Sequence, residues 1–240
     1  MATLFAPLPP VLAATTTGDD FPVRRVFCIG QNYAAHAAEM GAAPQAGAER
    51  APPFFFTKWN EAVVPTGSTI AYPQGTDDYH FEAELVVAIG KAGRDIPAAE
   101  ALDHVWGYGC GLDMTRRDLQ GQAKAKGRPW DAGKNVEQSA PLGVLTPAAD
   151  FDPTTGAIGL TVDGVERQSG DLSDQIWPVA DLIASLSGLY TLQPGDLIYT
   201  GTPSGVGPVS VGQRLVVSID GLTPLEVVIG PQAGPHTEQA

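Results

Sequence analysis

Three carboxylates in strand-like segments could together bind a divalent metal ion. Glu82 and Glu84 are two residues apart in the β-favouring run 82–89, and side chains two apart on a strand point to the same face. Like charges on a buried face repel and lose hydration, a cost that a cation between them removes. Asp113 ends a second strand-like run and offers a third oxygen. Oxygen ligands without cysteine favour a hard ion, Mg²⁺ or Mn²⁺.

A simpler interpretation of the same residues requires no metal. A Glu-x-Glu pair on an exposed strand is commonly solvated, and an aspartate after a strand commonly caps a turn or a helix. The run before Asp113 adds a clue, because Gly107, Gly109 and Gly111 share its parity and leave one strand face as bare backbone. Bare backbone admits a close neighbour, either another strand or a ligand. These residues alone leave both interpretations open.

The elements that would position these side chains are mostly strands joined by turns. The chain has 28 Gly and 21 Pro spread along its length, which favours short strands over a helical bundle. We expect Asn32 to cap a helix that Gly41 ends, and Thr115 with Asp118 to form a capping box on a helix that Gly127 ends. The expected helices are 33–40, 98–104, 115–126 and 179–186, and the expected strands are 21–29, 54–57, 62–64, 82–89, 105–114, 158–162, 196–199, 214–219 and 225–229.

Composition and charge exclude several classes of partner. The 240 residues are 43% apolar and 17% charged, as expected for one sizeable globular domain. The net charge of −13 argues against nucleic acid and against an anionic membrane surface. An acidic protein can still bind an acidic small molecule where a metal ion or local Lys and Arg residues reverse the field.

The cysteine content and the N-terminus indicate a cytoplasmic protein. Cys28 and Cys110 lie in apolar, strand-like runs, where buried free thiols are the simplest interpretation and a single disulfide is the alternative. Residues 1–14 contain three prolines and no basic residue, which argues against a signal peptide. No later stretch has the roughly 18 apolar residues of a membrane span.

Four separated motifs in a fixed order show that the chain resembles the fumarylacetoacetate hydrolase family over residues 23–230. The motifs are residues 28–40, 80–85, 107–120 and 200–207. The resemblance implies an α+β fold, a mixed β-roll with peripheral helices, in a homodimer. It also implies an N-terminal extension at 1–22, a catalytic domain at 23–232 and a flexible tail at 233–240.

The resemblance assigns roles to residues near the three carboxylates. It implies that Glu82, Glu84 and Asp113 bind Mg²⁺ or Mn²⁺. It implies that His36, oriented by Glu39 one helical turn away, activates a water molecule. Without it, His36 and Glu39 would be taken as an exposed pair on a surface helix.

Lys134 follows a Pro-Trp segment and is a candidate to stabilise a developing oxyanion, with an ordinary surface lysine as the alternative. The candidate substrate-binding residues lie within or close to these motifs. They are Gln31, Tyr33, Arg117, Gln120 and Thr202, with Lys58 as a weaker candidate.

Within the family, the chain is most similar to the subfamily that hydrolyses fumarylpyruvate to fumarate and pyruvate. The runs 52–56, 113–120, 127–130 and 139–141 carry this likeness. We expect His36 to take a proton from water, the resulting hydroxide to attack the C4 carbonyl of a 2,4-diketo acid, and the C3–C4 bond to break.

The chain also departs from the family pattern at a few positions. Members usually have Arg at Gln31 and Pro at Trp59, a small residue and Phe at Asn135 and Val136, and Asp at Glu137. If the missing Arg binds a distal carboxylate, the substrate is an acylpyruvate with an uncharged tail. Isomerisation or decarboxylation of a 2-oxo-dienoate, oxaloacetate decarboxylation, and a non-catalytic metal- or carboxylate-binding protein remain alternatives.

Overall fold

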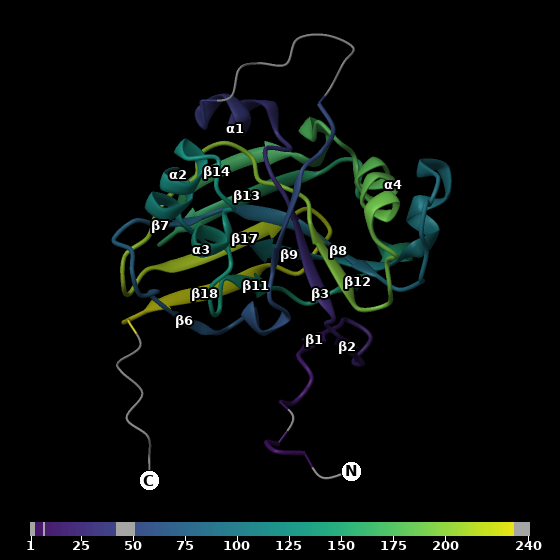
Figure 1. The fold of residues 1–240 in the computed structure, drawn as a ribbon, viewed down its shortest axis with the longest axis horizontal. Helices are drawn as coiled ribbons and strands as arrows, with labels where there is room; N and C mark the ends of the chain where they lie inside the picture. The colour runs from purple at the N-terminus through teal and green to yellow at the C-terminus, as the bar shows by residue number, and fades with distance from the viewer. Residues whose placement is uncertain (1–2, 7, 42–50, 233–240) are drawn as a thin grey trace.

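Two packed β-sheets build the frame of this protein, with short helices at the periphery (Figure 1). The computed structural model describes residues 3–6, 8–41 and 51–232. The larger sheet follows the order β4-β3-β15-β8-β9-β11-β5, and β12 also pairs with β9. Its strands are β4 (Phe55–Lys58), β3 (Arg25–Ile29), β15 (Asp196–Tyr199), β8 (Ala83–Ile89), β9 (Val105–Leu112), β11 (Ala140–Leu142), β5 (Val63–Pro65) and β12 (Thr146–Pro147).

The second sheet has the order β14-β13-β17-β18-β6. Its strands are β14 (Val165–Asp171), β13 (Ala157–Val162), β17 (Arg214–Ile219), β18 (Leu225–Gly230) and β6 (Thr69–Ala71). Both sheets are mixed, because β3 with β15, β5 with β11 and β6 with β18 run parallel while the other pairs are antiparallel. The expected α+β fold with mixed sheets is confirmed.

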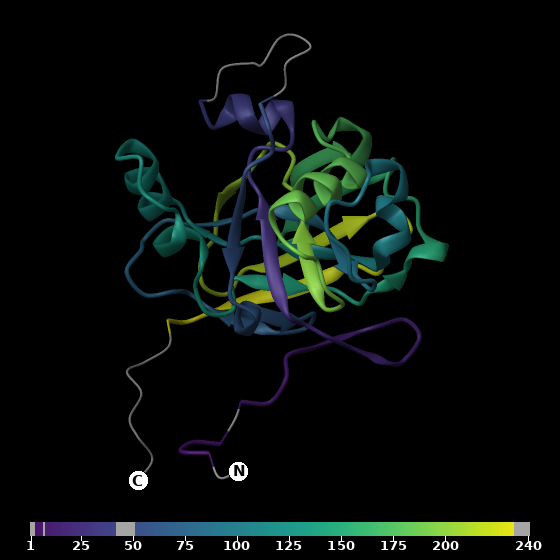
Figure 2. The same cartoon turned by 45° about the vertical axis from the view of Figure 1, so that its right-hand side comes forward.

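Two small sheets complete the strand set. β7 (Tyr79–Phe81) lies between β10 (Thr115–Arg116) and β16 (Gly207–Pro208), and β1 (Leu12–Ala14) pairs with β2 (Asp20–Pro22). The β1–β2 hairpin lies at the opposite end of the molecule from α1 (Figures 1 and 2). It packs against the larger sheet through Ala13 and Phe21, so part of the expected N-terminal extension joins the folded core.

The helices are short and lie around the sheets (Figure 2). They are α1 (Ala34–Glu39), α2 (Arg117–Ala125), α3 (Asp131–Lys134) and α4 (Val179–Leu189), with 3₁₀ turns η1 (Asn60–Ala62), η2 (Ala98–His104), η3 (Ala148–Asp150) and η4 (Leu172–Asp174). Among the described residues, no helix is long and apolar enough to cross a membrane.

Strand alternation divides the apolar side chains of β8 between two cores. Leu85, Val87 and Ile89 pack in the core shared with the second sheet. Val86 and Ala88 point to the other face, where Cys28 and Tyr199 also pack. Glu84 has the parity of Val86, and therefore lies on this second face. The two cysteines are buried and free, as expected.

Several local expectations are wrong. Residues 21–29 form two strands, because the chain turns at Val23 and Arg24 between β2 and β3. Asn32 does not cap α1; its amide donates to the main-chain oxygens of Trp177 and Thr200, and Tyr33 is the N-cap residue. The Thr115–Asp118 capping box is absent, because Thr115 lies in β10 and its hydroxyl donates to Asp113 O. The expected tail at 233–240 lies outside the described residues.

Candidate metal centre

The three predicted carboxylates meet on one face of the larger sheet. Glu84 pairs with Gly111 across β8 and β9, and Asp113 N donates to Glu82 O at 2.9 Å. One oxygen from each of Glu82, Glu84 and Asp113 lies within 4.8 Å of the others, and the three residues are 4%, 1% and 1% exposed. The exposed, solvated alternative is therefore excluded.

This cluster fits an Mg²⁺ or Mn²⁺ ion. Oxygens on one Mg²⁺ lie about 2.1 Å from the ion and thus at most about 4.2 Å from each other, close to the observed spacing. Burial, followed by the charges of Asp113 and Glu82, raises the pKa of the Glu84 carboxyl well above its ordinary value. A divalent cation among the three groups would relieve this repulsion.

The bare glycine face beside the cluster is covered by the protein itself. A Cβ on Gly107 would lie 2.2 Å from Thr146 O in β12. A Cβ on Gly111 would lie 2.4 Å from a methyl carbon of Val86 and 2.7 Å from the Tyr199 ring. The glycines therefore permit close packing of the chain beside the carboxylates, so the close neighbour is the protein itself, one of the two alternatives that the sequence left open.

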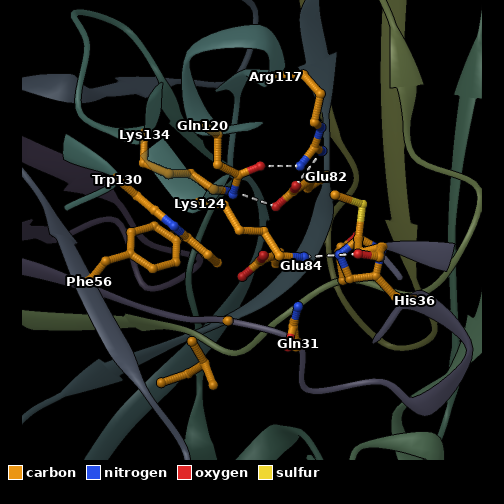
Figure 3. A pocket seen from close by; sticks show the side chains of 14 residues that line it. Gln31, His36, Phe56, Glu82, Glu84, Arg117, Gln120, Lys124, Trp130 and Lys134 are labelled. Atoms are coloured by element: carbon orange, nitrogen blue, oxygen red, sulfur yellow. Dashed lines mark hydrogen bonds and ion pairs between the residues drawn. The ribbon is translucent and has the colours of Figure 1, made fainter. Parts of the chain in front are cut away.

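Three buried or half-buried cations surround the carboxylates. Lys134 Nζ bridges Glu82 Oε2 at 2.6 Å and Asp113 Oδ2 at 2.7 Å. Arg117 Nη2 lies 2.5 Å from Glu82 Oε1, and Lys58 Nζ lies 2.9 Å from Asp113 Oδ1. Figure 3 shows Lys134 and Arg117 converging on Glu82, with Gln120 accepting a hydrogen bond from Arg117.

These ion pairs control the charge of the site. Burial disfavours the Glu82 carboxylate, but the charges of Lys134 and Arg117 outweigh it and hold the pKa of Glu82 well below its ordinary value. Burial likewise opposes the Lys134 ammonium, yet Asp113 and Glu82 raise the pKa of Lys134. Lys134 is therefore charged, 2% exposed and directed into the site, which excludes the surface-lysine alternative.

His36 and Glu39 form a pair on α1 at the edge of the site. His36 Nδ1 lies 3.2 Å from Glu39 Oε2, and His36 is 5% exposed. A carboxylate only accepts hydrogen bonds, so Nδ1 must donate to Glu39. In the neutral tautomer with the proton on Nδ1, Nε2 is the basic nitrogen. Gly205 N donates to both Glu39 oxygens at 3.2 Å, which fixes the carboxylate from the other side.

A pocket brings together most of the predicted side chains (Figure 3). Its lining residues come from segments that lie far apart in the sequence. They are Ile29, Gly30, Gln31, His36, Met40, Phe56, Glu82, Glu84, Arg117, Gln120, Lys124, Trp130, Lys134 and Thr202. Asp113 lies just behind this lining, within the carboxylate cluster.

Two candidate substrate-binding residues, Tyr33 and Lys58, lie outside the pocket lining, as does Glu39, which contacts His36. Tyr33 is 2% exposed and is the N-cap residue of α1. Lys58 is buried behind Asp113, where its ammonium donates to Met114 O at 3.0 Å, to Ser139 Oγ at 2.9 Å and to Lys134 O. Lys58 therefore holds together segments of the site instead of facing a ligand.

Sequence reasoning did not identify Lys124, Phe56 or Trp130 as site residues. Lys124 Nζ donates to Met40 O at 2.9 Å, which ties α2 to the end of α1. Phe56 and Trp130 contact each other at 5.9 Å between ring centroids, and Lys134 Nζ lies 5.1 Å from the centroid of Phe56. The spacing of Lys124 four residues after Gln120 was the available signal, because such residues share a helix face.

Two departures from the family pattern contact each other. Trp59 N donates to Asn135 Oδ1 at 2.8 Å. Proline has no N–H group and could not make this bond. The pair links the end of β4 to the residue after Lys134.

The chain is similar to several known proteins over most of its length. The family model described as fumarylacetoacetate (FAA) hydrolase C-terminal matches residues 25–229. A fumarylpyruvate hydrolase from Ralstonia sp is 46% identical over 178 residues, covering 74% of this chain and 93% of that protein. An oxaloacetate tautomerase from Escherichia coli (strain K12) is 40% identical over 205 residues, covering 84% and 91%.

A solved structure is also similar to this chain. It is fumarylpyruvate hydrolase from Pseudomonas aeruginosa in complex with Mn²⁺ and pyruvate, with a TM-score of 0.91 and 50% sequence identity. The alignment covers 96% of this chain and 100% of that one.

Proposed function

This chain belongs to the fumarylacetoacetate hydrolase family, and we propose that it is a metal-dependent hydrolase that cleaves a carbon–carbon bond of fumarylpyruvate to give fumarate and pyruvate. The observation that carries the proposal is the buried Glu82–Glu84–Asp113 cluster beside a pocket that His36 also lines, with Glu39 in contact with His36. The 50% identity to an enzyme of this activity, solved with Mn²⁺ and pyruvate, supports it.

The charge balance of the site favours an anionic substrate. The three carboxylates of the cluster face three cations, so these groups have no net charge when all are ionised. The cations are Lys58, Arg117 and Lys134. A divalent ion held by the three carboxylates would make the site net positive inside a chain of net charge −13. Carboxylates of the substrate restore neutrality.

The chain's own groups can perform the proton transfers. Bound Mg²⁺ or Mn²⁺, held by Glu82, Glu84 and Asp113, would supply Lewis acidity and a template for the 2-oxo acid end. His36 Nε2 takes a proton from water while Glu39, itself fixed by Gly205 N, holds the imidazole in place. The water oxygen bonds to C4, the C3–C4 bond breaks, and the His36 proton is returned to C3. Lys134 stabilises the negative charge that develops on oxygen.

The position of Lys124 favours fumarylpyruvate, which has a distal carboxylate, over an acylpyruvate with an uncharged tail as the substrate. Gln31 is neutral, so it cannot replace the charge of an Arg at that position. Lys124 lines the same pocket and is exposed, with ammonium donors beyond the one that bonds Met40 O. Phe56 and Trp130 provide an apolar wall for the carbon chain between the two ends.

Oxaloacetate tautomerisation is the second candidate. The Escherichia coli tautomerase is 40% identical across 84% of this chain. Both reactions need an enolised 2-oxo acid, and the metal cluster alone does not separate them. Hydrolysis additionally needs a base for water, which His36 provides.

The test measures loss of enol absorbance for fumarylpyruvate, acetylpyruvate and oxaloacetate with Mg²⁺, with Mn²⁺ and with chelator. We expect metal-dependent loss of fumarylpyruvate with an equal amount of pyruvate formed. A preference for acetylpyruvate would show that the tail pocket does not recognise a distal carboxylate. Conversion of oxaloacetate alone, by metal-loaded protein that forms no pyruvate from either diketo acid, would refute the hydrolase proposal.

The expected homodimer, cytoplasmic location and domain limits stay predictions. Analytical sedimentation of the purified chain tests whether it forms a homodimer.

A further inference from the structure

A β-bulge turns one glutamine of the second sheet into the protein interior. In the β13–β14 ladder, Leu160 pairs with Gln168 and Thr161 pairs with Glu166, so Arg167 has no partner. Residues on either side of Gln168 are exposed, whereas Gln168 is 1% exposed. Bulges commonly redirect a side chain in this way.

The buried amide of Gln168 has a fixed orientation. Its Oε1 accepts from Ala83 N at 2.9 Å, and its Nε2 donates to Pro203 O at 2.8 Å. A main-chain N–H only donates and a main-chain oxygen only accepts, so exchanging Oε1 and Nε2 would break both bonds. The amide therefore presents N–H groups, and no acceptor, to the loop after β15.

This orientation determines what the Thr202 hydroxyl can do. Gln168 Nε2 donates to Thr202 Oγ1 at 2.8 Å, so the hydroxyl oxygen acts as an acceptor in that bond. Its own proton points elsewhere, and the part of the chain that the structure describes offers no hydrogen-bond acceptor for it. Thr202 lines the pocket and is 2% exposed, so that proton is available to a ligand oxygen.

We propose that Gln168 is a positioning residue that makes the Thr202 hydroxyl a hydrogen-bond donor toward a carboxylate or carbonyl oxygen of the bound 2-oxo acid. The nature of that acid rests on the proposed function. The donor role of Thr202 rests on the three bonds of Gln168 alone.

The same bulge supports a second group of the loop. A Cβ on Gly205, whose φ is +95°, would lie 2.2 Å from Arg167 O. Gly205 N in turn donates to Glu39. Arg167 and Gln168 thus hold the backbone that carries both the Thr202 donor and the Glu39 contact.

A purely structural role for Gln168 makes a different prediction. Ala83 stands between Glu82 and Glu84, so a glutamine that only anchors β8 would affect the carboxylates and the metal affinity. A glutamine that orients Thr202 affects ligand affinity and depends on the Thr202 hydroxyl. Metal binding and ligand binding must therefore be measured separately.

The test uses pyruvate as the probe on full-length, Mn²⁺-loaded protein, by titration calorimetry, with Mn²⁺ affinity measured independently. Thr202→Val should weaken pyruvate binding about 10-fold or more, because hydrogen bonds to charged groups are worth about 1.5–3 kcal/mol. Thr202→Ser, which keeps the hydroxyl, should stay within about 3-fold of wild type. Gln168→Met should weaken binding about 3- to 10-fold, as expected for one lost hydrogen bond.

The decisive measurement is the double variant. In the Thr202→Val background, Gln168→Met should cause no further loss, and Mn²⁺ affinity should stay unchanged throughout. Gln122→Met on the exposed surface of α2 is the matched control and should bind pyruvate as wild type does. Gln168→Glu keeps an acceptor for Ala83 N and replaces the Met variant if that protein does not fold.

Three results from the variants would overturn the inference. The first is that Thr202→Val binds pyruvate with wild-type affinity. The second is that Gln168→Met lowers pyruvate affinity to the same extent in the Thr202→Val background as in the wild type. The third is that Mn²⁺ affinity falls in parallel with pyruvate affinity. Absence of Mn²⁺-dependent pyruvate binding in the wild type would also overturn it. Because no step requires turnover, failure to hydrolyse any diketo acid would refute the proposed function while leaving this test intact.

Discussion

At the residue scale, the proposed chemistry depends on a base and on a charged cluster that lie close together but are held by different elements. His36 and Glu39 belong to α1, whereas Glu84 lies in β8, Glu82 directly precedes β8 and Asp113 directly follows β9. Glu39 is fixed from the other side by Gly205 N. The base can therefore be removed without disturbing the metal ligands, and the two functions can be tested one at a time.

Replacing His36 should abolish most turnover and spare metal binding. We expect His36→Asn to lower kcat by about 10²- to 10⁴-fold, the usual contribution of a general base. Glu39→Gln should lower it less, about 10-fold, because the imidazole keeps a hydrogen-bond partner but loses the carboxylate charge. Steady-state kinetics and Mn²⁺ titration check both variants, with Glu100→Gln on the exposed face of η2 as the control. Equal turnover in His36→Asn and wild type would exclude His36 as the base.

The raised pKa of Glu84 gives a pH dependence that can be measured without substrate. Burial and the neighbouring carboxylates raise the pKa of Glu84 in the folded protein. Between the ordinary pKa of about 4.3 and the raised value, the folded protein holds a proton that the unfolded chain has released. The contribution of Glu84 to stability is therefore fully present below the unfolded pKa and is lost as pH rises through the folded pKa.

In the presence of a chelator, the free energy of unfolding of the wild type should fall relative to that of the Glu84→Gln variant as the pH rises from about 5 to 8. Glutamine has nearly the same shape and does not titrate, so the difference between the two proteins isolates Glu84. Urea unfolding at several pH values provides the measurement. Parallel pH profiles for the two proteins would contradict the prediction.

At the element scale, the loop between β15 and β16 is shaped by close packing against β14. Gly205 and Gly212 both have positive φ, +95° and +91°. A Cβ on Gly205 would lie 2.2 Å from Arg167 O, whereas a Cβ on Gly212 would have nothing within 4 Å. Alanine at Gly212 therefore tests only the free-energy cost of the backbone conformation, whereas alanine at Gly205 adds the cost of a steric clash.

Gly205→Ala should therefore cost more than Gly212→Ala. The Gly212 variant should lose about 1–2 kcal/mol of unfolding free energy for the left-handed conformation and keep full activity. The Gly205 variant should lose about 1–3 kcal/mol more from overpacking. It should also lower kcat, because the displaced loop releases Glu39. Denaturant unfolding and kinetics measure both effects, and equal losses in the two variants would show that the clash is relieved without cost.

At the scale of the whole molecule, metal binding and folding should reinforce each other. The three ligands come from the start of β8 and the end of β9, central strands of the larger sheet. A ligand that binds only the folded state stabilises it by about 2.7 kcal/mol at 100 times its dissociation constant. For a chain of this size, that corresponds to a rise in Tm of about 5–10 °C.

Thermal unfolding with Mn²⁺, with Mg²⁺ and with chelator checks this expectation. Asp113→Asn should abolish the rise in Tm, because it removes one of the three ligand charges. A rise of the same size in that variant would place the stabilising ion elsewhere on this acidic protein.

The sequence by itself determined the parts of the protein that depend on local periodicity. Alternation along 82–89 placed Glu82 and Glu84 on one face, and the shared parity of Gly107, Gly109, Gly111 and Asp113 predicted close packing beside the third ligand. The spacing of His36 and Glu39 predicted their contact on a helix. These relations follow from backbone geometry within one segment, and the family motifs were sufficient to assign the fold.

Only the tertiary structure decided which distant residues complete the site. Gln168 contacts Ala83 across 85 positions, Lys124 contacts Met40 across 84, and Trp59 contacts Asn135 across 76. The Thr115–Asp118 capping box was wrong for the same reason, because pairing of β10 with β7 drew Thr115 into a strand. Local propensities are worth tenths of a kcal/mol, whereas leaving a buried polar group unpaired costs about 1–3 kcal/mol, so long-range pairing prevails.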